Sequence, residues 1–185
     1  MAFPLKLTVF TALLLLAACR SDPIRFHTLT PTQVGNHSTT TVGVIQIETI
    51  SLPPQVDRAQ IVIREGNSTL AILESHWWGA TLVEELRSAL ADQLSNSPVK
   101  GKYSVRVDVQ RFDSVPGQYA LMDVIWRLRS AEPGNKAQVI CRSTLQTPSG
   151  ATVDELVLAQ QNNIKRLAAL ISQAATRPQA SCPSS

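Results

Sequence analysis

Alternating apolar and polar positions predict β-strands in the middle of the chain. The clearest alternation runs through residues 103–109, where odd positions are apolar and even positions are polar. A period of two is typical of a strand with one buried face. Phe112 breaks the parity, which predicts a β-bulge near Arg111.

Further apolar segments, most of them bounded by Pro, Gly or Asn residues, also have strand character. They are residues 42–50, 61–63, 70–73, 120–128 and 139–145. The short segments 61–63 and 70–73 flank a Gly-Asn turn and predict a hairpin.

Two segments show the period of amphipathic helices. Each begins with a Thr-x-x-Glu capping box, at Thr81–Glu84 and at Thr152–Glu155. The apolar stripe of the first comprises Leu82, Leu86, Ala89, Leu90 and Leu94. The stripe of the second comprises Val153, Leu156, Val157, Ile164, Leu167, Ala168, Ile171 and Ala174. The order of elements predicts a single α+β domain, in which two amphipathic helices pack on a mainly antiparallel sheet.

The amino terminus carries a short apolar run, Leu7–Ala18, of 12 residues. A membrane-spanning helix needs about 20 such residues, so the run predicts a signal peptide that follows Lys6. Leu16-Ala17-Ala18-Cys19 resembles the bacterial lipobox, in which the cysteine is lipidated and becomes the first mature residue. An ordinary signal peptidase site near a cysteine is the alternative. By resemblance to Gram-negative lipoproteins, Arg20 in place of an aspartate predicts the outer membrane.

These features divide the chain into four parts. We predict a signal peptide over residues 1–18 and a lipidated Cys19 with a flexible tether over residues 19–41. The folded domain is predicted over residues 42–175 and a C-terminal tail over residues 176–185. Within the tether, only Arg25–Leu29 has strand-like character.

Charge and cysteine content narrow the function classes. Removal of Lys6 with the signal leaves 16 basic and 14 acidic residues, without a Lys/Arg cluster that would indicate nucleic acid as a partner. Cys141 and Cys182 remain in a compartment where disulfides persist. Either the two cysteines form one disulfide bridge, or Cys141 is a small buried apolar residue.

The sequence contains none of the common catalytic or nucleotide-binding motifs, so we expect neither enzyme activity nor a cofactor. The histidines His27, His37 and His76 lack metal-ligand spacing and are interpreted as surface or turn residues. Of the adjacent tryptophans, Trp78 is predicted in the core. Trp77 is predicted at the surface as a partner-binding residue, because neighbouring side chains at a helix entrance do not easily face one core.

Several motifs in order resemble the ABC-type transport auxiliary lipoprotein family. They are the lipobox, Leu52-Pro53, Asp57–Val62, Trp78–Leu82 and Tyr103–Asp113. The resemblance covers about residues 42–175. The chain departs from the family pattern at Thr81, where a proline is often found. It also has Gln160 and Gln161 in the region of the closing helix where a tryptophan often stands.

The resemblance implies a noncatalytic subunit on the periplasmic face of the outer membrane. Such subunits work with an MCE-domain periplasmic protein and an inner-membrane ABC transporter, in systems that move lipids between membranes or maintain membrane integrity. No binding residues are carried over from the family. Two other classes stay open, a structural lipoprotein of another envelope assembly or secretion machine and a periplasmic enzyme. The sequence also leaves self-association into a homo-oligomer open.

Overall fold

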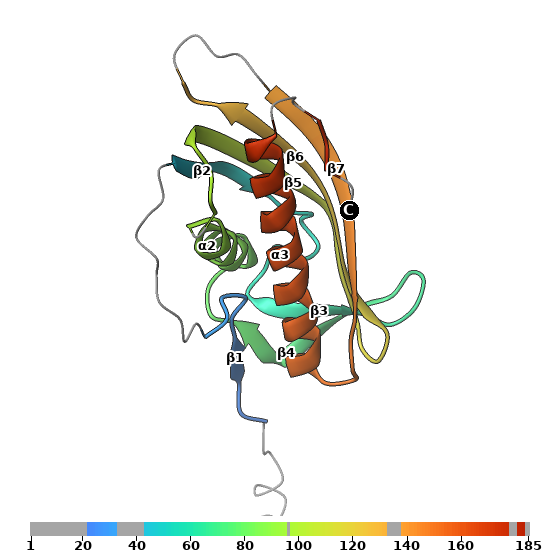
Figure 1. The fold of residues 1–185 in the computed structure, drawn as a ribbon. Coiled ribbons are helices and arrows are strands. Elements are labelled where there is room, and N and C mark those ends of the chain that lie inside the picture. The colour runs from blue at the N-terminus through green and yellow to red at the C-terminus, as the bar shows by residue number, and fades with distance from the viewer. Residues whose placement is uncertain (1–21, 33–42, 96, 133–137, 178–180, 184–185) are drawn as a thin grey trace, which may run out of the picture.

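A computed structural model describes residues 22–32, 43–95, 97–132, 138–177 and 181–183 (Figure 1). The predicted signal peptide, Cys19 and His37 lie outside these residues. Within them, the protein has seven strands in two sheets and two long helices, which agrees with the predicted α+β class.

The larger sheet has the strand order β2-β5-β6-β7. Its strands are β2 (Gly43–Ser51), β5 (Gly101–Val115), β6 (Tyr119–Ser130) and β7 (Gln138–Pro148). β5, β6 and β7 form the predicted antiparallel meander, in which apolar side chains on one face are buried. β2 joins its edge in parallel with β5. The predicted bulge is confirmed, because the β5–β6 register shifts between Val109 and Arg111.

The smaller sheet has the order β1-β4-β3. Its strands are β1 (Arg25–His27), β3 (Gln60–Arg64) and β4 (Leu70–Trp78). β3 and β4 form the predicted hairpin, whereas β1 pairs in parallel with β4. The expectation of one sheet is therefore corrected to two. The hairpin and the following helix supply the long crossover that the parallel β2–β5 pair requires.

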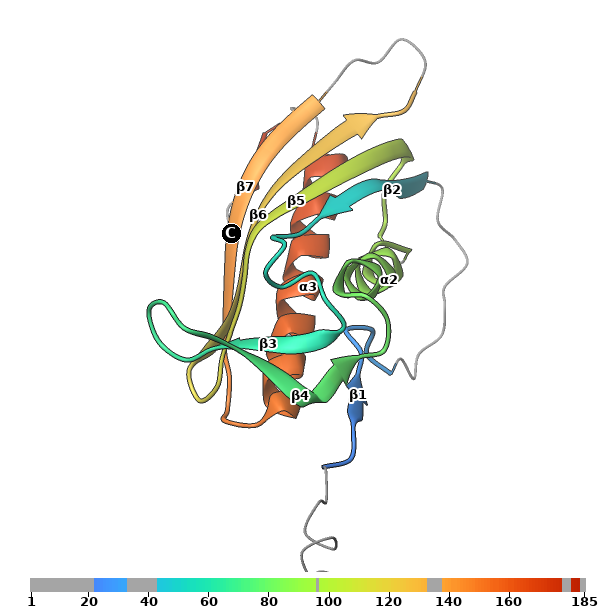
Figure 2. The same cartoon turned by 180° about the vertical axis from the view of Figure 1, so that it is seen from behind.

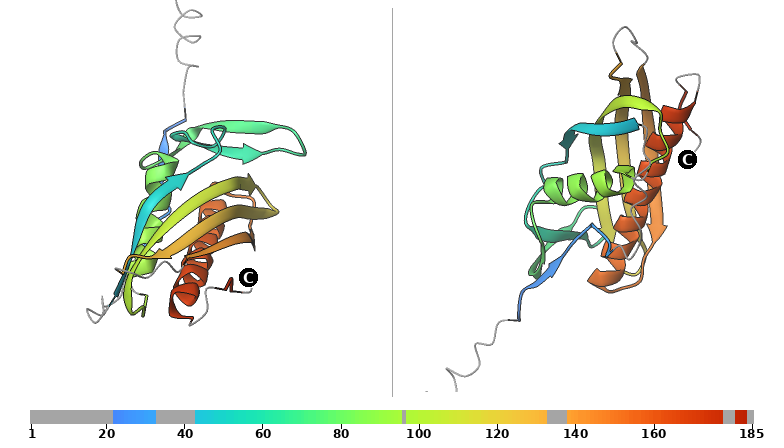
Figure 3. Two further views of the ribbon diagram at one scale, coloured as in Figure 1. Left: turned by 90° about the horizontal axis from the view of Figure 1, so that it is seen from above. Right: turned by 60° about the vertical axis from the view of Figure 1, so that its left-hand side comes forward.

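Helix α2 (Leu82–Ser95) and helix α3 (Val153–Thr176) lie on the same face of the larger sheet (Figures 1 and 3). α3 contacts β6 and β7, and α2 contacts α3 and β2. The predicted stripe of α2 is buried, and the stripe of α3 is buried except for Val153, which packs partly buried against the core. The predicted capping box of α3 is confirmed, since Thr152 and Glu155 bond reciprocally.

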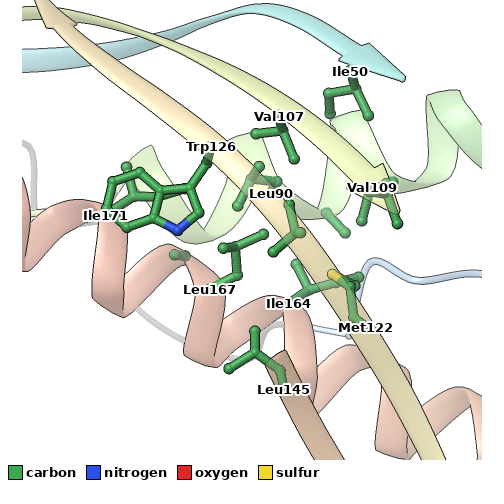
Figure 4. Packing of buried hydrophobic residues seen from close by; sticks show 14 of the residues in the cluster. Ile50, Leu90, Val107, Val109, Met122, Trp126, Leu145, Ile164, Leu167 and Ile171 are labelled. Atoms are coloured by element: carbon green, nitrogen blue, oxygen red, sulfur yellow. The ribbon is translucent and has the colours of Figure 1, made fainter. Parts of the chain in front are cut away.

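The core lies between the larger sheet and helices α2 and α3, and residues of the smaller sheet join it (Figure 4). Trp126 of β6 is fully buried and points toward Leu167 and Ile171 of the helix (Figure 4). Its indole Nε1 donates a 3.0 Å hydrogen bond to the Ser143 hydroxyl of β7. This bond satisfies the polar atom that burial of a tryptophan would otherwise leave unpaired.

The folded part begins earlier than the predicted boundary at residue 42. Leu29 is fully buried, and its amide donates a 2.8 Å hydrogen bond to Oε2 of Glu85 on α2. The Thr28 hydroxyl donates to the same oxygen, and Gln161 of α3 donates to the Thr28 carbonyl. The tether prediction is therefore wrong for residues 25–29, which α2, α3 and β4 hold against the domain.

Candidate functional site

The two adjacent tryptophans lie on opposite faces at the end of β4. Trp78 is 4% exposed and belongs to the hydrophobic core, as predicted. Trp77 is only half-buried, and its Nε1 donates a 2.9 Å hydrogen bond to the Glu74 carbonyl. The pair sits at the end of β4, just before α2 begins at Leu82. The period of a strand explains the opposite orientations.

Apolar side chains from the start of the described chain lie beside Trp77. Phe26 is its register partner across the parallel β1–β4 pair, so the two side chains share a face of the smaller sheet. Phe26 is 67% exposed, and Ile24, just before β1, is 51% exposed. We call Ile24, Phe26 and Trp77 the aromatic surface. Exposed aromatic residues of this kind are favoured anchors in protein interfaces.

A polar cluster supports the other face of the same strand pair. His27 Nε2 lies 2.9 Å from His76 Nδ1, and His27 Nδ1 lies 3.3 Å from Asp154 Oδ1 at the start of α3. Burial lowers the pKa of His27, and the adjacent His76 lowers it further, whereas Asp154 acts in the opposite direction. The cluster therefore joins β1 to β4 and α3.

This arrangement corrects the interpretation of His27 as a surface residue, since its side chain is only 7% exposed. No local pattern in the sequence indicates this pair, because the two histidines are 49 positions apart. Among the described residues, no group of three His, Cys, Asp or Glu side chains is placed to hold a metal ion.

Cys141 of β7 and Cys182 of the C-terminal segment form a disulfide in the structure, with 2.06 Å between the sulfur atoms. Cys141 is buried beside Trp126, its register partner on β6. The bridge fastens residues 181–183 of the predicted tail to the edge strand of the larger sheet.

Replacing Cys182 with serine is expected to lower the free energy of unfolding by about 2–4 kcal/mol. The upper value is the loss of loop entropy for a 41-residue separation. Denaturant unfolding of the variant and of the wild type, both purified from the periplasm, measures the difference. Two free thiols per molecule in the wild-type preparation would contradict the bridge.

An open groove lies between the edge strand β2 and helix α2, with a cavity volume of about 690 Å³. Val44, Ile45, Ala91 and Leu94 supply apolar lining, and Lys102 is among its polar residues. Within the described residues, no helix combines the length and apolar character needed to cross a membrane. The structure thus presents a single α+β domain with exposed contact surfaces and open grooves.

Comparison with known proteins assigns the chain to a family. The chain belongs to the family of ABC-type transport auxiliary lipoprotein components, which it matches over residues 27–172. The match begins within β1, in agreement with the early start of the folded part. A comparison with curated protein sequences finds no match.

Two solved structures share the fold. One is the crystal structure of an uncharacterized protein, with a TM-score of 0.64 and 14% identity, covering 82% of this chain and 98% of the other. The second is protein XCC0632 from Xanthomonas campestris, with a TM-score of 0.60 and 16% identity, covering 82% and 93% of the two chains. At these identities the likeness concerns the fold alone.

Proposed function

We propose that the protein is an outer-membrane lipoprotein subunit of an MCE/ABC-type system that transports lipids between membranes or maintains membrane integrity. Family membership over residues 27–172 is the observation that carries this proposal, because it connects the chain to ABC-type transport. The lipobox that ends at Cys19 supplies the anchor, and Arg20 supports the outer membrane.

The proposed role is noncatalytic docking of a periplasmic partner. The aromatic surface suits this role, because Phe26 exposes a large ring beside the half-buried ring of Trp77 on a pair of hydrogen-bonded strands. The histidine pair holds β1, and Glu85 and Gln161 hold the residues just after it, so the rings are preorganised before a partner arrives. Preorganised side chains lose less conformational entropy on binding. The partner on this surface is an MCE-domain protein.

Replacing Trp77 with alanine is expected to leave folding nearly intact and to weaken partner capture. An interface anchor contributes about 2 kcal/mol or more, which corresponds to roughly 30-fold in Kd. The measurement is affinity capture from cross-linked envelopes with the lipidated full chain as bait, followed by identification of the bound proteins. Phe26→Ala is expected to act in the same direction.

Leu158→Ala is the matched control, since Leu158 is an exposed apolar residue on α3 and lies outside the aromatic surface. This variant is expected to capture as much partner protein as the wild type does. Undiminished capture by both Trp77→Ala and Phe26→Ala would contradict docking through this surface. If the captured proteins include neither an MCE-domain protein nor an ABC transporter component, the proposed system is wrong.

A further inference from the structure

The face of the larger sheet opposite the helices carries a cluster of arginines. In Figure 2, strands β5, β6 and β7 lie in front of α3, and the β3–β4 hairpin crosses them near one end, where Arg64 of β3 contacts Asp113 of β5. Arg106 of β5 and Arg127 and Arg129 of β6 are all exposed there. Together with Glu48 of β2, Ser104 and Gln138, they line a cavity of about 130 Å³. We call this cavity the arginine cleft.

Positive charge in the arginine cleft exceeds the negative charge available to it. Arg106 Nε donates a 2.6 Å hydrogen bond to Glu48, and a guanidinium nitrogen of Arg129 lies 3.3 Å from the other oxygen of the same carboxylate. One carboxylate therefore serves two guanidinium groups. The hydroxyl of Ser104 and then Arg106 lower the pKa of Glu48 to about 2, so this carboxylate is ionised at neutral pH.

Arg127 adds a third positive charge to the arginine cleft. Its guanidinium group makes no hydrogen bond or ion pair with any residue that the structure describes, and Arg127 lies directly opposite Arg106 in the β5–β6 register. Like charges at directly opposed positions of a sheet destabilise it. The nearby Asp108 accepts a hydrogen bond from Ser51, and it lies in an adjoining cavity without reaching Arg127 as an ion pair. The three guanidinium groups and Glu48 leave a net charge of +2.

The volume of the arginine cleft and its guanidinium groups suit a small anion such as phosphate. Guanidinium groups hold phosphate through paired, charge-assisted hydrogen bonds. The volume of a water molecule in the liquid is about 30 Å³, so a cavity of about 130 Å³ accepts a group of a few heavy atoms, such as phosphate, and not a folded peptide segment.

The border of the arginine cleft is apolar on one side. Ile140 of β7 is the register partner of Arg127 and is 55% exposed, and Ile125 lines the adjoining cavity together with Arg127. A phosphate group attached to an apolar body would contact both kinds of residue. We infer that the arginine cleft binds the phosphate of an anionic phospholipid headgroup, with the glycerol and the start of the acyl chains toward Ile140. This inference rests on the proposed membrane anchoring, which keeps the domain near lipid.

The test uses the mature lipidated chain in micelles of an uncharged detergent. Thermal unfolding is measured while phosphatidylglycerol is added, because a ligand that binds only the folded state raises Tm. Phosphatidylglycerol is expected to raise Tm in a saturable manner. Diacylglycerol, which lacks the phosphate, is expected to leave Tm unchanged at the same concentration. An equal shift with inorganic phosphate alone would overturn the assignment to lipid.

Variants at the cleft separate binding from folding. Arg127→Gln is expected to weaken the apparent affinity about tenfold or more, as for the loss of one charge-assisted contact, while Tm without lipid is unchanged or slightly raised. Glu48→Gln is expected to tighten binding several-fold, because it removes the competing carboxylate. A purely structural role of the cluster predicts no such gain. Lys165→Gln on α3 removes one exposed positive charge elsewhere and is the matched control.

The same variants separate this inference from the docking proposal. Arg127→Gln is expected to capture the periplasmic partner as the wild type does, and Trp77→Ala is expected to bind phosphatidylglycerol as the wild type does. If Arg127→Gln and Lys165→Gln lose the same lipid response, attraction to net charge explains the response and the arginine cleft is not a site. If no variant changes the response of Tm to phosphatidylglycerol, the inference is also wrong.

Discussion

Replacing Trp78 with alanine is expected to lower the free energy of unfolding by about 3–5 kcal/mol. The Trp78 side chain is 4% exposed and packs in the core cluster, so its removal leaves a cavity there. The Trp78 amide donates to the Ala59 carbonyl just before β3, and the amide of the next residue, Gly79, donates to the His27 carbonyl of β1. Urea unfolding of the purified chain measures the loss.

Trp77→Ala is the internal control for this substitution, because it removes the same side chain one residue away. Its expected cost is below about 1 kcal/mol, since the Trp77 ring is half-buried on the outer face of the strand. If both variants unfold at the same urea concentration, Trp77 contributes to packing as Trp78 does. The aromatic surface would then be an extension of the core and not a docking surface.

Most of the larger sheet and both helices could be predicted from local periodicity. Residues 103–109 alternate strictly because the core lies on only one face of β5 there, which leaves the other face polar. The break at Phe112 indicated the bulge, since an extra residue shifts every later side chain to the opposite face. The capping box at Thr152 located the start of α3 because capping depends only on neighbouring residues.

The first strand and its contacts could not be predicted in the same way. β1 has only three residues, too few for a period, and it pairs with a strand about fifty positions later in the chain. The amide of the buried Leu29 bonds to Glu85, and from sequence alone Glu85 is explained equally well as part of a helix start. The histidine pair and the division into two sheets depend on the same long-range pairing.

In the arginine cleft, the sequence pattern predicts which way the arginine side chains point but not which of them lie together. Alternation along the strands predicts that Arg127 and Arg129 point away from the core, as they do. Their approach to Arg106 depends on the β5–β6 register, and the shared Glu48 depends on the parallel addition of β2. No single segment of the sequence contains that information. Surface chemistry built from several strands therefore emerged only with the fold.

Replacing Cys19 with serine is expected to abolish labelling of the protein with radioactive palmitate and to leave its signal peptide uncut by the lipoprotein peptidase. The acyl chains are proposed to attach through the Cys19 thiol, which serine lacks. Burial of acyl chains contributes about 0.8 kcal/mol per methylene, and two or more chains give stable anchoring. We therefore expect the wild type in the outer-membrane fraction and an unlabelled, uncut precursor for the variant.

Cys182→Ser is the matched control, because it makes the same substitution at a cysteine that the structure places in a disulfide. This variant is expected to incorporate palmitate as the wild type does, although its folded domain is less stable. Labelling that persists in Cys19→Ser would contradict the lipobox interpretation. Without an anchor at Cys19, the arginine cleft would no longer be held near lipid, and the membrane role of the domain would depend on its protein partner alone.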